Sequence, residues 1–168
     1  MRALAASRFG DTPRGFLSRG SYRADGATVA KWGNWHCGEN KARFDDQHEA
    51  TEATVYEPFI VGDAVRIAIV GDRHWQIRLT GDDWRKSIHH AEAAPMAVDD
   101  ALLADARHLA EHFGLQMIGV DYIVAEDGTP HLLEVNHIPN VTVFEEMTDA
   151  FVELELGWVP SADHISAS

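Results

Sequence analysis

Two carboxylates on either side of a turn have a spacing that could hold a divalent cation. Asp127-Gly128 is a dipeptide typical of a two-residue β-hairpin loop, and the segments 117–125 and 131–136 that flank it are predicted to be strands. Such a loop pairs Asp121 directly with Glu134. Opposed Cβ atoms in a hairpin lie roughly 5 Å apart, and like charges at that distance are destabilising unless a cation neutralises them.

An amide extends this acidic pair. Asn136 shares the face of Glu134, about 7 Å along the strand, and Gly119 opposite it leaves space. The same face is predicted to carry Met117, Ile123 and Leu132, whereas Val120, Tyr122, Leu133 and Val135 on the other face are predicted to be core. Carboxylate and amide oxygens are ligands that suit Mg²⁺ or Mn²⁺. The alternative is an exposed acidic pair whose repulsion water tolerates, and the spacing alone leaves both open.

Composition narrows the class of partner. The chain has 168 residues with 14 Lys and Arg against 27 Asp and Glu, a formal net charge of −13. We expect neither a nucleic acid nor an anionic membrane as partner, because both would be repelled, whereas a divalent cation fits. The single cysteine, Cys37, cannot form an internal disulfide, which favours a reducing, cytoplasmic location. An Arg-rich start over residues 1–23 leaves a transit peptide as the alternative.

Hydrophobic patterning predicts the elements that must position these residues. Asp99 or Asp100 is predicted to cap a helix that ends at Phe113, before Gly114. Segment 39–52 is polar without clear periodicity, and 81–95 reads as irregular. The remaining elements are predicted as strands over 27–32, 53–60, 65–70 and 75–79 and a short helix over 149–156.

At this point the residues resemble a known family. GVDYIV and HLLEVNHIPN resemble the C-terminal metal-binding signature of the ATP-grasp superfamily, and its glutathione-synthetase-like and ribosomal-S6-modification-like carboxylate–amine ligases in particular. The family's strand aspartate and E-x-N triplet match Asp121, Glu134 and Asn136, which the resemblance makes metal ligands. It runs from about residue 27 to residue 158.

The resemblance also implies a nucleotide site. Lys31 in TVAKW matches the strand lysine that contacts phosphate, and residues 33–38 match the glycine loop over the triphosphate. YEPFIVG matches the adenine hinge, with Glu57, Pro58, Phe59 and Ile60 as its contacts. Proline has no N–H, so Phe59 or Ile60 must supply the donor. Asp63 is the expected ribose ligand, and Arg66 matches the following strand arginine.

Two further arginines match family positions that contact phosphate and substrate. They are Arg78 and Arg85, the latter within an Asp-Trp-Arg triplet reminiscent of peptide-macrocyclising ATP-grasp ligases. We expect both to be catalytic, with Arg85 at the acylphosphate or the substrate carboxylate. Without the resemblance, Lys31 reads as a solvated strand end, and Arg66 and Arg78 as salt-bridge partners. His108 and His112 have zinc-ligand spacing but no evident third ligand, which favours a solvated helix face.

The implied fold is α+β, with antiparallel sheets, flanking helices and the nucleotide between two lobes. The implied function is ATP- and Mg²⁺-dependent ligation of a small-molecule or peptide carboxylate to an amine, through an acylphosphate and with ADP release. A small-molecule kinase of the same superfamily and a non-catalytic nucleotide-binding module or partner subunit are the alternatives. ADP release that depends on an amine would separate the ligase from the kinase, and nucleotide binding without ADP release would identify the module.

The resemblance also suggests a domain organisation. We expect an Arg-rich segment over residues 1–26 that forms part of the N-terminal lobe, an ATP-grasp-like domain over 27–158, and a flexible tail over 159–168. Fewer residues precede Lys31 than the family usually carries there. We therefore expect a homo-oligomer or a partner chain to complete the cleft; the alternative is that the chain is a minimal or fragmentary member of the family.

Overall fold

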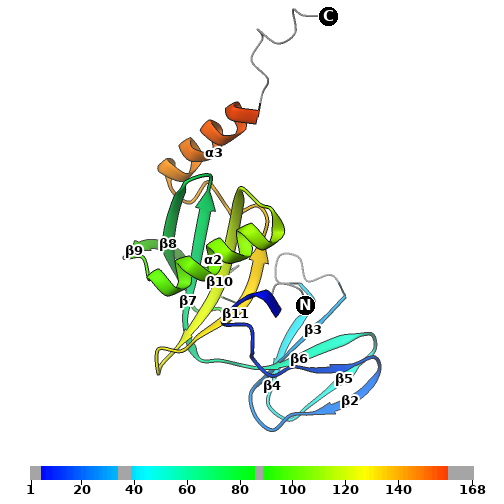
Figure 1. Cartoon of the computed structure of the whole chain (residues 1–168). Coiled ribbons are helices and arrows are strands. Elements are labelled where there is room, and N and C mark those ends of the chain that lie inside the picture. Colours follow the sequence, from blue (N-terminus) through cyan, green and yellow to red (C-terminus); the bar gives the residue numbers. More distant parts are fainter. Residues whose placement is uncertain (1–4, 34–38, 86–88, 159–168) are drawn as a thin grey trace, which may run out of the picture.

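The chain folds into two lobes joined at one side. The computed structural model describes residues 5–33, 39–85 and 89–158. Figure 1 shows a small β-rich lobe, built from β1 to β6, beside a larger lobe whose sheet carries helix α2 across one face. This is the α+β architecture, with antiparallel sheets and flanking helices, that the sequence predicts. None of its described helices is both long enough and apolar enough to cross a membrane.

The small lobe consists of a four-stranded antiparallel sheet in the order β1-β6-β3-β4 and a two-stranded sheet of β2 and β5. The core between them is aromatic: Tyr22 stacks on Tyr56 with ring centroids 3.9 Å apart. The strands are β1 (Gly15–Leu17), β2 (Gly20–Arg23), β3 (Thr28–Trp32), β4 (Lys41–Phe44), β5 (Gln47–Ala50) and β6 (Thr54–Pro58).

The large lobe is a five-stranded antiparallel sheet in the order β11-β10-β7-β8-β9. Its strands are β7 (Gly62–Val70), β8 (Arg73–Thr80), β9 (Glu92–Met96), β10 (Met117–Ala125) and β11 (Pro130–Asn136). Side chains alternate between the two faces along each strand. On one face, Val65, Ile67 and Ile69 of β7 pack with buried residues of β10 and of α2.

Helix α2 (Asp100–Phe113) begins and ends where the sequence predicts. The Asp99 side chain accepts hydrogen bonds from the backbone N–H groups of Ala101 and Leu102, which satisfies two of the donors left free at a helix start. Gly114 ends the helix in the left-handed conformation, with φ of 64°, which costs a glycine nothing. The apolar stripe of the helix then covers the sheet.

The opposite face of the sheet packs against helix α3 (Glu145–Trp158) and the segment that precedes it. Helix α3 places Ala150 against Val70 and Met117, at the ends of β7 and β10 remote from the small lobe. Nearer the small lobe, the same face carries Arg66 of β7 and Asp121 of β10, which are paired across the two strands. The sheet thus buries a charged pair within this otherwise apolar face.

The hairpin of β10 and β11 corrects the prediction in one detail and confirms it in another. The loop contains three residues, 126–128, because the Ala125 N–H donates to the Thr129 carbonyl. A bulge between Asp121 and Tyr122 then restores the register, so that Asp121 does lie opposite Glu134. The bulge reverses the predicted face of Leu132, which pairs with Tyr122 and belongs to the core.

Space predicted at Gly119 is filled in the structure. Gly119 pairs with Asn136 as expected, but a Cβ atom added there would lie 3.0 Å from the Cβ of Pro139. Pro139, which is buried, therefore occupies the room that the glycine leaves.

Two segments connect the lobes. The first runs from β6 to β7 through Gly62, where a side chain would overlap the Val124 carbonyl oxygen. The second is the N-terminal segment 5–14, which the large lobe holds through Asp105 of α2. This carboxylate is fully buried and accepts from the Ser7 hydroxyl, the Arg8 N–H and the Tyr122 hydroxyl, at 2.7–2.9 Å. Burial raises the pKa of Tyr122, and the charge of Asp105 acts in the same direction.

Candidate functional site

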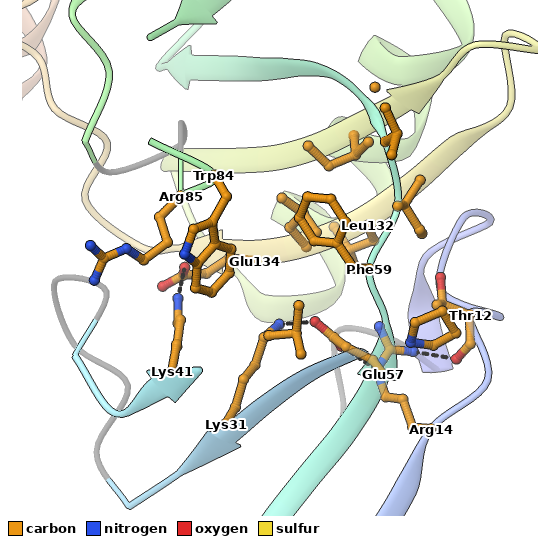
Figure 2. A pocket seen from close by; sticks show the side chains of 17 residues that line it. Thr12, Arg14, Lys31, Lys41, Glu57, Phe59, Trp84, Arg85, Leu132 and Glu134 are labelled. Atoms are coloured by element: carbon orange, nitrogen blue, oxygen red, sulfur yellow. Dashed lines mark hydrogen bonds and ion pairs between the residues drawn. The ribbon is translucent and has the colours of Figure 1, made fainter. Parts of the chain in front are cut away.

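A cavity lies where the two lobes meet, and most of its wall is apolar. Val29 of the small lobe faces Ile123, Leu132 and Leu133 of the large lobe, and the connecting segment 58–62 closes one side. Trp84 lines the cavity from the loop after β8, and its ring lies edge-on to that of Phe59, with centroids 6.2 Å apart. Figure 2 shows the charged side chains that reach into this cavity from both lobes.

Lys31 reaches the cavity from β3 and forms an ion pair with Glu57 of β6. Arg14 approaches Glu57 from the other side, with Nε 3.2 Å from Oε2, and also donates to the Gly10 and Thr12 carbonyls. Glu57 is 8% exposed. A carboxylate this buried requires cations, and it has two. The predicted hinge residue Glu57 thus holds the predicted phosphate lysine at the cavity wall.

The connecting segment offers few free backbone donors to a ligand. Pro58 has no N–H, and the Phe59 N–H donates to the Ala27 carbonyl at 2.8 Å. Phe59 and Ile60 are the two residues predicted to donate a backbone N–H to adenine. Because the Phe59 N–H is used within the small lobe, the Ile60 N–H remains as the candidate donor. The Phe59 ring lies 3.9 Å from the Arg43 guanidinium, which holds it in place beside the cavity.

Three charged residues form a row across β7, β10 and β11. Arg66 donates to both oxygens of Asp121, at 2.6 Å through Nε and 2.9 Å through a terminal nitrogen, and both side chains are buried. Burial acts to lower the pKa of Arg66, but the hydrogen bonds and charge of Asp121 outweigh it and raise that pKa. Glu134 lies opposite Asp121 and lines the cavity. Register therefore places Asp121 directly beside the cavity wall.

Lys41 is a site residue that the sequence interpretation missed. It lies opposite Lys31 on β4, lines the cavity, and places its ammonium nitrogen 3.8 Å from Glu134 of the large lobe. Burial lowers the pKa of Lys41, as does the charge of Lys31, while Glu134 acts to raise it. The sequence shows only a lysine within the polar stretch 39–52. Because that stretch has no clear strand periodicity, it does not predict on which face of a sheet the Lys41 side chain lies. Arg14 was missed because no strand was predicted near it.

Arg85 lines the cavity, and Asp83 fixes its orientation. Its side chain donates to Asp83 through Nε at 3.0 Å and through a terminal nitrogen at 2.9 Å, and its backbone N–H donates at 2.7 Å. These hydrogen bonds lower the pKa of Asp83 to about 2. The guanidinium is about one-third exposed, so it is held in place at the mouth of the cavity yet remains accessible.

Five predicted site residues do not line the cavity: Asp63, Arg66, Arg78, Asp121 and Asn136. Arg66 and Asp121 lie on the strands next to Glu134, whereas Arg78 and Asp63 lie apart from it. Arg78 pairs across the sheet with Val65, and therefore lies on the face that α2 covers, away from Asp121 and Glu134. Its exposed guanidinium lies 3.7 Å from Asp63, which is itself exposed. Neither side chain lines the cavity. The glycine loop 33–38 and Cys37 fall largely outside the described residues, since only Gly33 of that stretch is described.

Solved structures of similar fold include ATP-grasp ligases. A chain from Chryseobacterium gregarium, a RiPP-associated ATP-grasp ligase solved with ADP and a leader and core peptide, superposes with a TM-score of 0.57 at 14% identity, over 87% of this chain and 56% of its own. The ATP-grasp ligase PsnB, solved with minimal precursor, Mg and ADP, superposes with a TM-score of 0.60 at 16% identity, over 91% of this chain and 56% of its own. D-cycloserine synthetase DcsG superposes with a TM-score of 0.66 at 14% identity, over 93% of this chain and 67% of its own.

The chain has the ATP-grasp fold. The sequence model of the tubulin-tyrosine ligase family also matches, over residues 74–153, just under half of the chain. A search of curated proteins finds no match. The resemblance predicted from the sequence is thus confirmed at the level of the fold, and the chain spans little more than half the length of the first two structures.

The ATP-grasp chain has donors that fit a hard divalent cation. Both oxygens of Asp121 accept from Arg66, but a carboxylate oxygen has a second lone pair to offer. Among the residues that the structure describes, Glu134 has only the long contact to Lys41, and no hydrogen bond uses the Asn136 side chain. No group of three or more His, Cys, Asp or Glu side chains within the described ranges could hold a metal. An Asp-Glu-Asn site would need the Asn136 amide as its third ligand.

Proposed function

We propose that the chain binds Mg-ATP in the cavity between its lobes and joins a carboxylate to an amine, with ADP release. The observation that carries the proposal is the arrangement of the cavity within an ATP-grasp fold. An apolar wall adjoins two lysines, and Glu134 and Asp121 follow on the neighbouring strands. A nucleotide has apolar and charged parts in the same order, since its base is apolar on both faces and its phosphates require cations.

The apolar part of the cavity suits adenine, with the Ile60 N–H and the Pro58 carbonyl as candidate polar contacts. Lys31 and Lys41 would then contact the phosphates. Asp63, the expected ribose ligand, directly follows Gly62 of the cavity wall but does not itself line the cavity. Asp121, Glu134 and Asn136 would hold Mg²⁺, or Mn²⁺ in its place. The bound metal would neutralise phosphate charge that develops during transfer.

The reaction would proceed in two steps. A carboxylate oxygen attacks the γ-phosphorus, the bond from that phosphorus to the bridging oxygen breaks, and ADP leaves with the electron pair. The amine nitrogen then attacks the acyl carbon, the carbon–oxygen bond to phosphate breaks, and the amine proton passes to solvent. Arg85, held by Asp83 at the cavity mouth, would stabilise negative charge on the transferred group.

The acceptor is proposed to be a peptide or small molecule bearing a carboxylate. Two structures of similar fold were solved with peptide precursors, which supports a peptide without identifying one. A second copy or a partner chain is proposed to complete the acceptor surface.

The products of ATP cleavage test this function. The protein is incubated with Mg-ATP, a pool of acidic peptides and hydroxylamine, which replaces the amine and traps an acylphosphate as a hydroxamate. We expect ADP, phosphate and hydroxamate in equal amounts. AMP with pyrophosphate, or phosphate transferred stably to a hydroxyl without an amine, would overturn the ligase. If the protein binds ADP but does not cleave ATP in the presence of any of the peptides, it is a non-catalytic nucleotide-binding module.

A further inference from the structure

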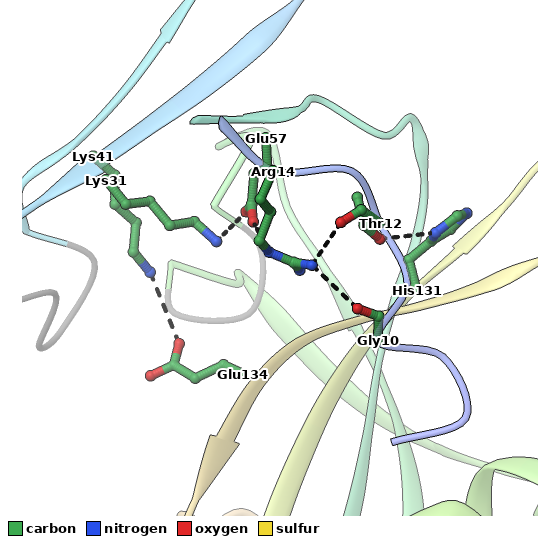
Figure 3. A network of polar contacts seen from close by, with 8 residues as sticks. All are labelled: Gly10, Thr12, Arg14, Lys31, Lys41, Glu57, His131 and Glu134. Atoms are coloured by element: carbon green, nitrogen blue, oxygen red, sulfur yellow. Dashed lines mark hydrogen bonds and ion pairs between the residues drawn. The ribbon is translucent and has the colours of Figure 1, made fainter. Parts of the chain in front are cut away.

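Two lysines face each other across neighbouring strands of the small lobe. Lys31 of β3 pairs with Lys41 of β4, and their side chains are 12% and 10% exposed. Like charges directly opposite each other destabilise a sheet, the more so when they are shielded from water. The arrangement is tolerated because each ammonium reaches a different carboxylate, as Figure 3 shows.

The two carboxylates differ in what else holds them. Glu57 lies in the small lobe with Lys31 and is also bound by Arg14. Glu134 lies on β11 of the large lobe, opposite Asp121, whose two oxygens accept from Arg66. Within the described residues, Lys41 is the one cation within ion-pair distance of Glu134. The Lys41–Glu134 ion pair therefore spans the cavity from one lobe to the other.

Glu134 is also one of the carboxylates that the proposed function gives to the metal. An ammonium group beside a carboxylate weakens the binding of a divalent cation to it, because the two cations repel each other at close range. Lys41 lies 3.8 Å from an oxygen of Glu134 that the metal would use. Nucleotide phosphate would offer the Lys41 ammonium a second anionic partner within the same cavity.

We infer that Lys41 is an internal counter-ion of Glu134 that competes with the divalent cation, and that nucleotide phosphate releases Glu134 by drawing Lys41 away. The inference rests on the proposed nucleotide site. It makes metal binding weaker without nucleotide than with it, because a metal that binds alone must overcome the charge of Lys41 beside Glu134. Such coupling is reciprocal, so the metal must strengthen nucleotide binding by the same factor.

Binding of Mn²⁺ alone tests the competition. Free Mn²⁺ is measured by electron paramagnetic resonance in titrations of the wild type, Lys41→Met and Lys31→Met without nucleotide. Lys41→Met is expected to bind Mn²⁺ about tenfold more tightly than the wild type, a change within the usual range of coupling between sites. Lys31→Met loses the same charge from the same cavity but leaves Lys41 on Glu134, so its Mn²⁺ affinity is expected to stay close to that of the wild type.

A second titration contains saturating ADP. ADP is expected to strengthen Mn²⁺ binding to the wild type at least fivefold, and this gain is expected to shrink in Lys41→Met. Lys41→Arg keeps the charge and is expected to behave like the wild type, which excludes a mere packing effect. Thermal unfolding without ligands confirms that each variant is folded.

Three results would overturn the inference: equal Mn²⁺ affinity of Lys41→Met and the wild type without nucleotide, equal tightening in both lysine variants, or no Mn²⁺ binding by any protein at millimolar concentration. Failure of the proposed function gives a different pattern. In that case ADP neither binds nor alters Mn²⁺ binding, while the titration without nucleotide still reports on Lys41 and Glu134.

Discussion

Replacing Arg66 by methionine is expected to lower the free energy of unfolding by about 3–5 kcal/mol. Arg66 supplies both hydrogen bonds that the structure gives to the Asp121 carboxylate, and Asp121 is 1% exposed. Methionine preserves much of the unbranched stem but leaves a buried carboxylate without its cation. Equilibrium unfolding in urea, monitored by tryptophan fluorescence at neutral pH, measures the change.

A surface ion pair provides the matched control. Arg73 pairs with Glu153 at 2.9 Å, but both side chains are about half exposed or more. Arg73→Met is expected to cost no more than about 1 kcal/mol, because water screens such pairs. Adding Asp121→Asn to Arg66→Met should recover stability, since no buried charge then remains unpaired. Equal losses in Arg66→Met and Arg73→Met would show that the Arg66–Asp121 pair does not stabilise the sheet as described.

Replacing Arg85 by alanine is expected to lower the rate of ADP formation by about 100-fold while ADP affinity changes little. The guanidinium lies at the cavity mouth, where Asp83 holds it through two side-chain hydrogen bonds. A cation that acts on charge formed only during phosphoryl transfer affects turnover more than ground-state binding. The assay uses Mg-ATP with acidic peptides and hydroxylamine, and calorimetry gives the ADP affinity.

Arg78→Ala serves as the control for this substitution. The resemblance predicts a catalytic role for Arg78 as well, but strand alternation places it on the face of the sheet that α2 covers. Its loss is therefore expected to leave the rate within about twofold. A rate loss in Arg78→Ala as large as that in Arg85→Ala would contradict the site described here. So would an Arg85→Ala variant with unchanged turnover.

Much of the large lobe follows from local sequence signals. The cap at Asp99, the stop at Gly114 and the apolar stripe between them locate α2 within a residue. Strand β10 has the predicted bounds, because a long run of apolar and β-branched residues leads to a turn. The pairing of Asp121 with Glu134 was correct although the loop was wrong, because the bulge offsets the extra loop residue. The strand pairing at Asp121 was thus predicted correctly, whereas the face on which the neighbouring Leu132 lies was not.

The small lobe was harder to predict from its sequence. Strands β2, β4 and β5 have four residues each and carry charged or polar side chains, so their alternation is too brief to separate from a loop. Of the cations at the cavity, Lys41 begins β4, and Arg14 precedes β1, which has only three residues. Their roles depend on contacts between residues far apart in the chain, Arg14 with Glu57 and Lys41 with Glu134. No local pattern encodes those contacts.

The change in melting temperature caused by ADP with Mg²⁺ tests the central claim, a metal–nucleotide site between the lobes, most directly. A ligand at 100 times its dissociation constant adds about 2.7 kcal/mol to stability, which for a chain of this size corresponds to a rise of roughly 5–10 °C. We expect a rise of this order with both ligands and a smaller one with ADP alone. An unchanged melting temperature at millimolar ADP and Mg²⁺ would contradict the account.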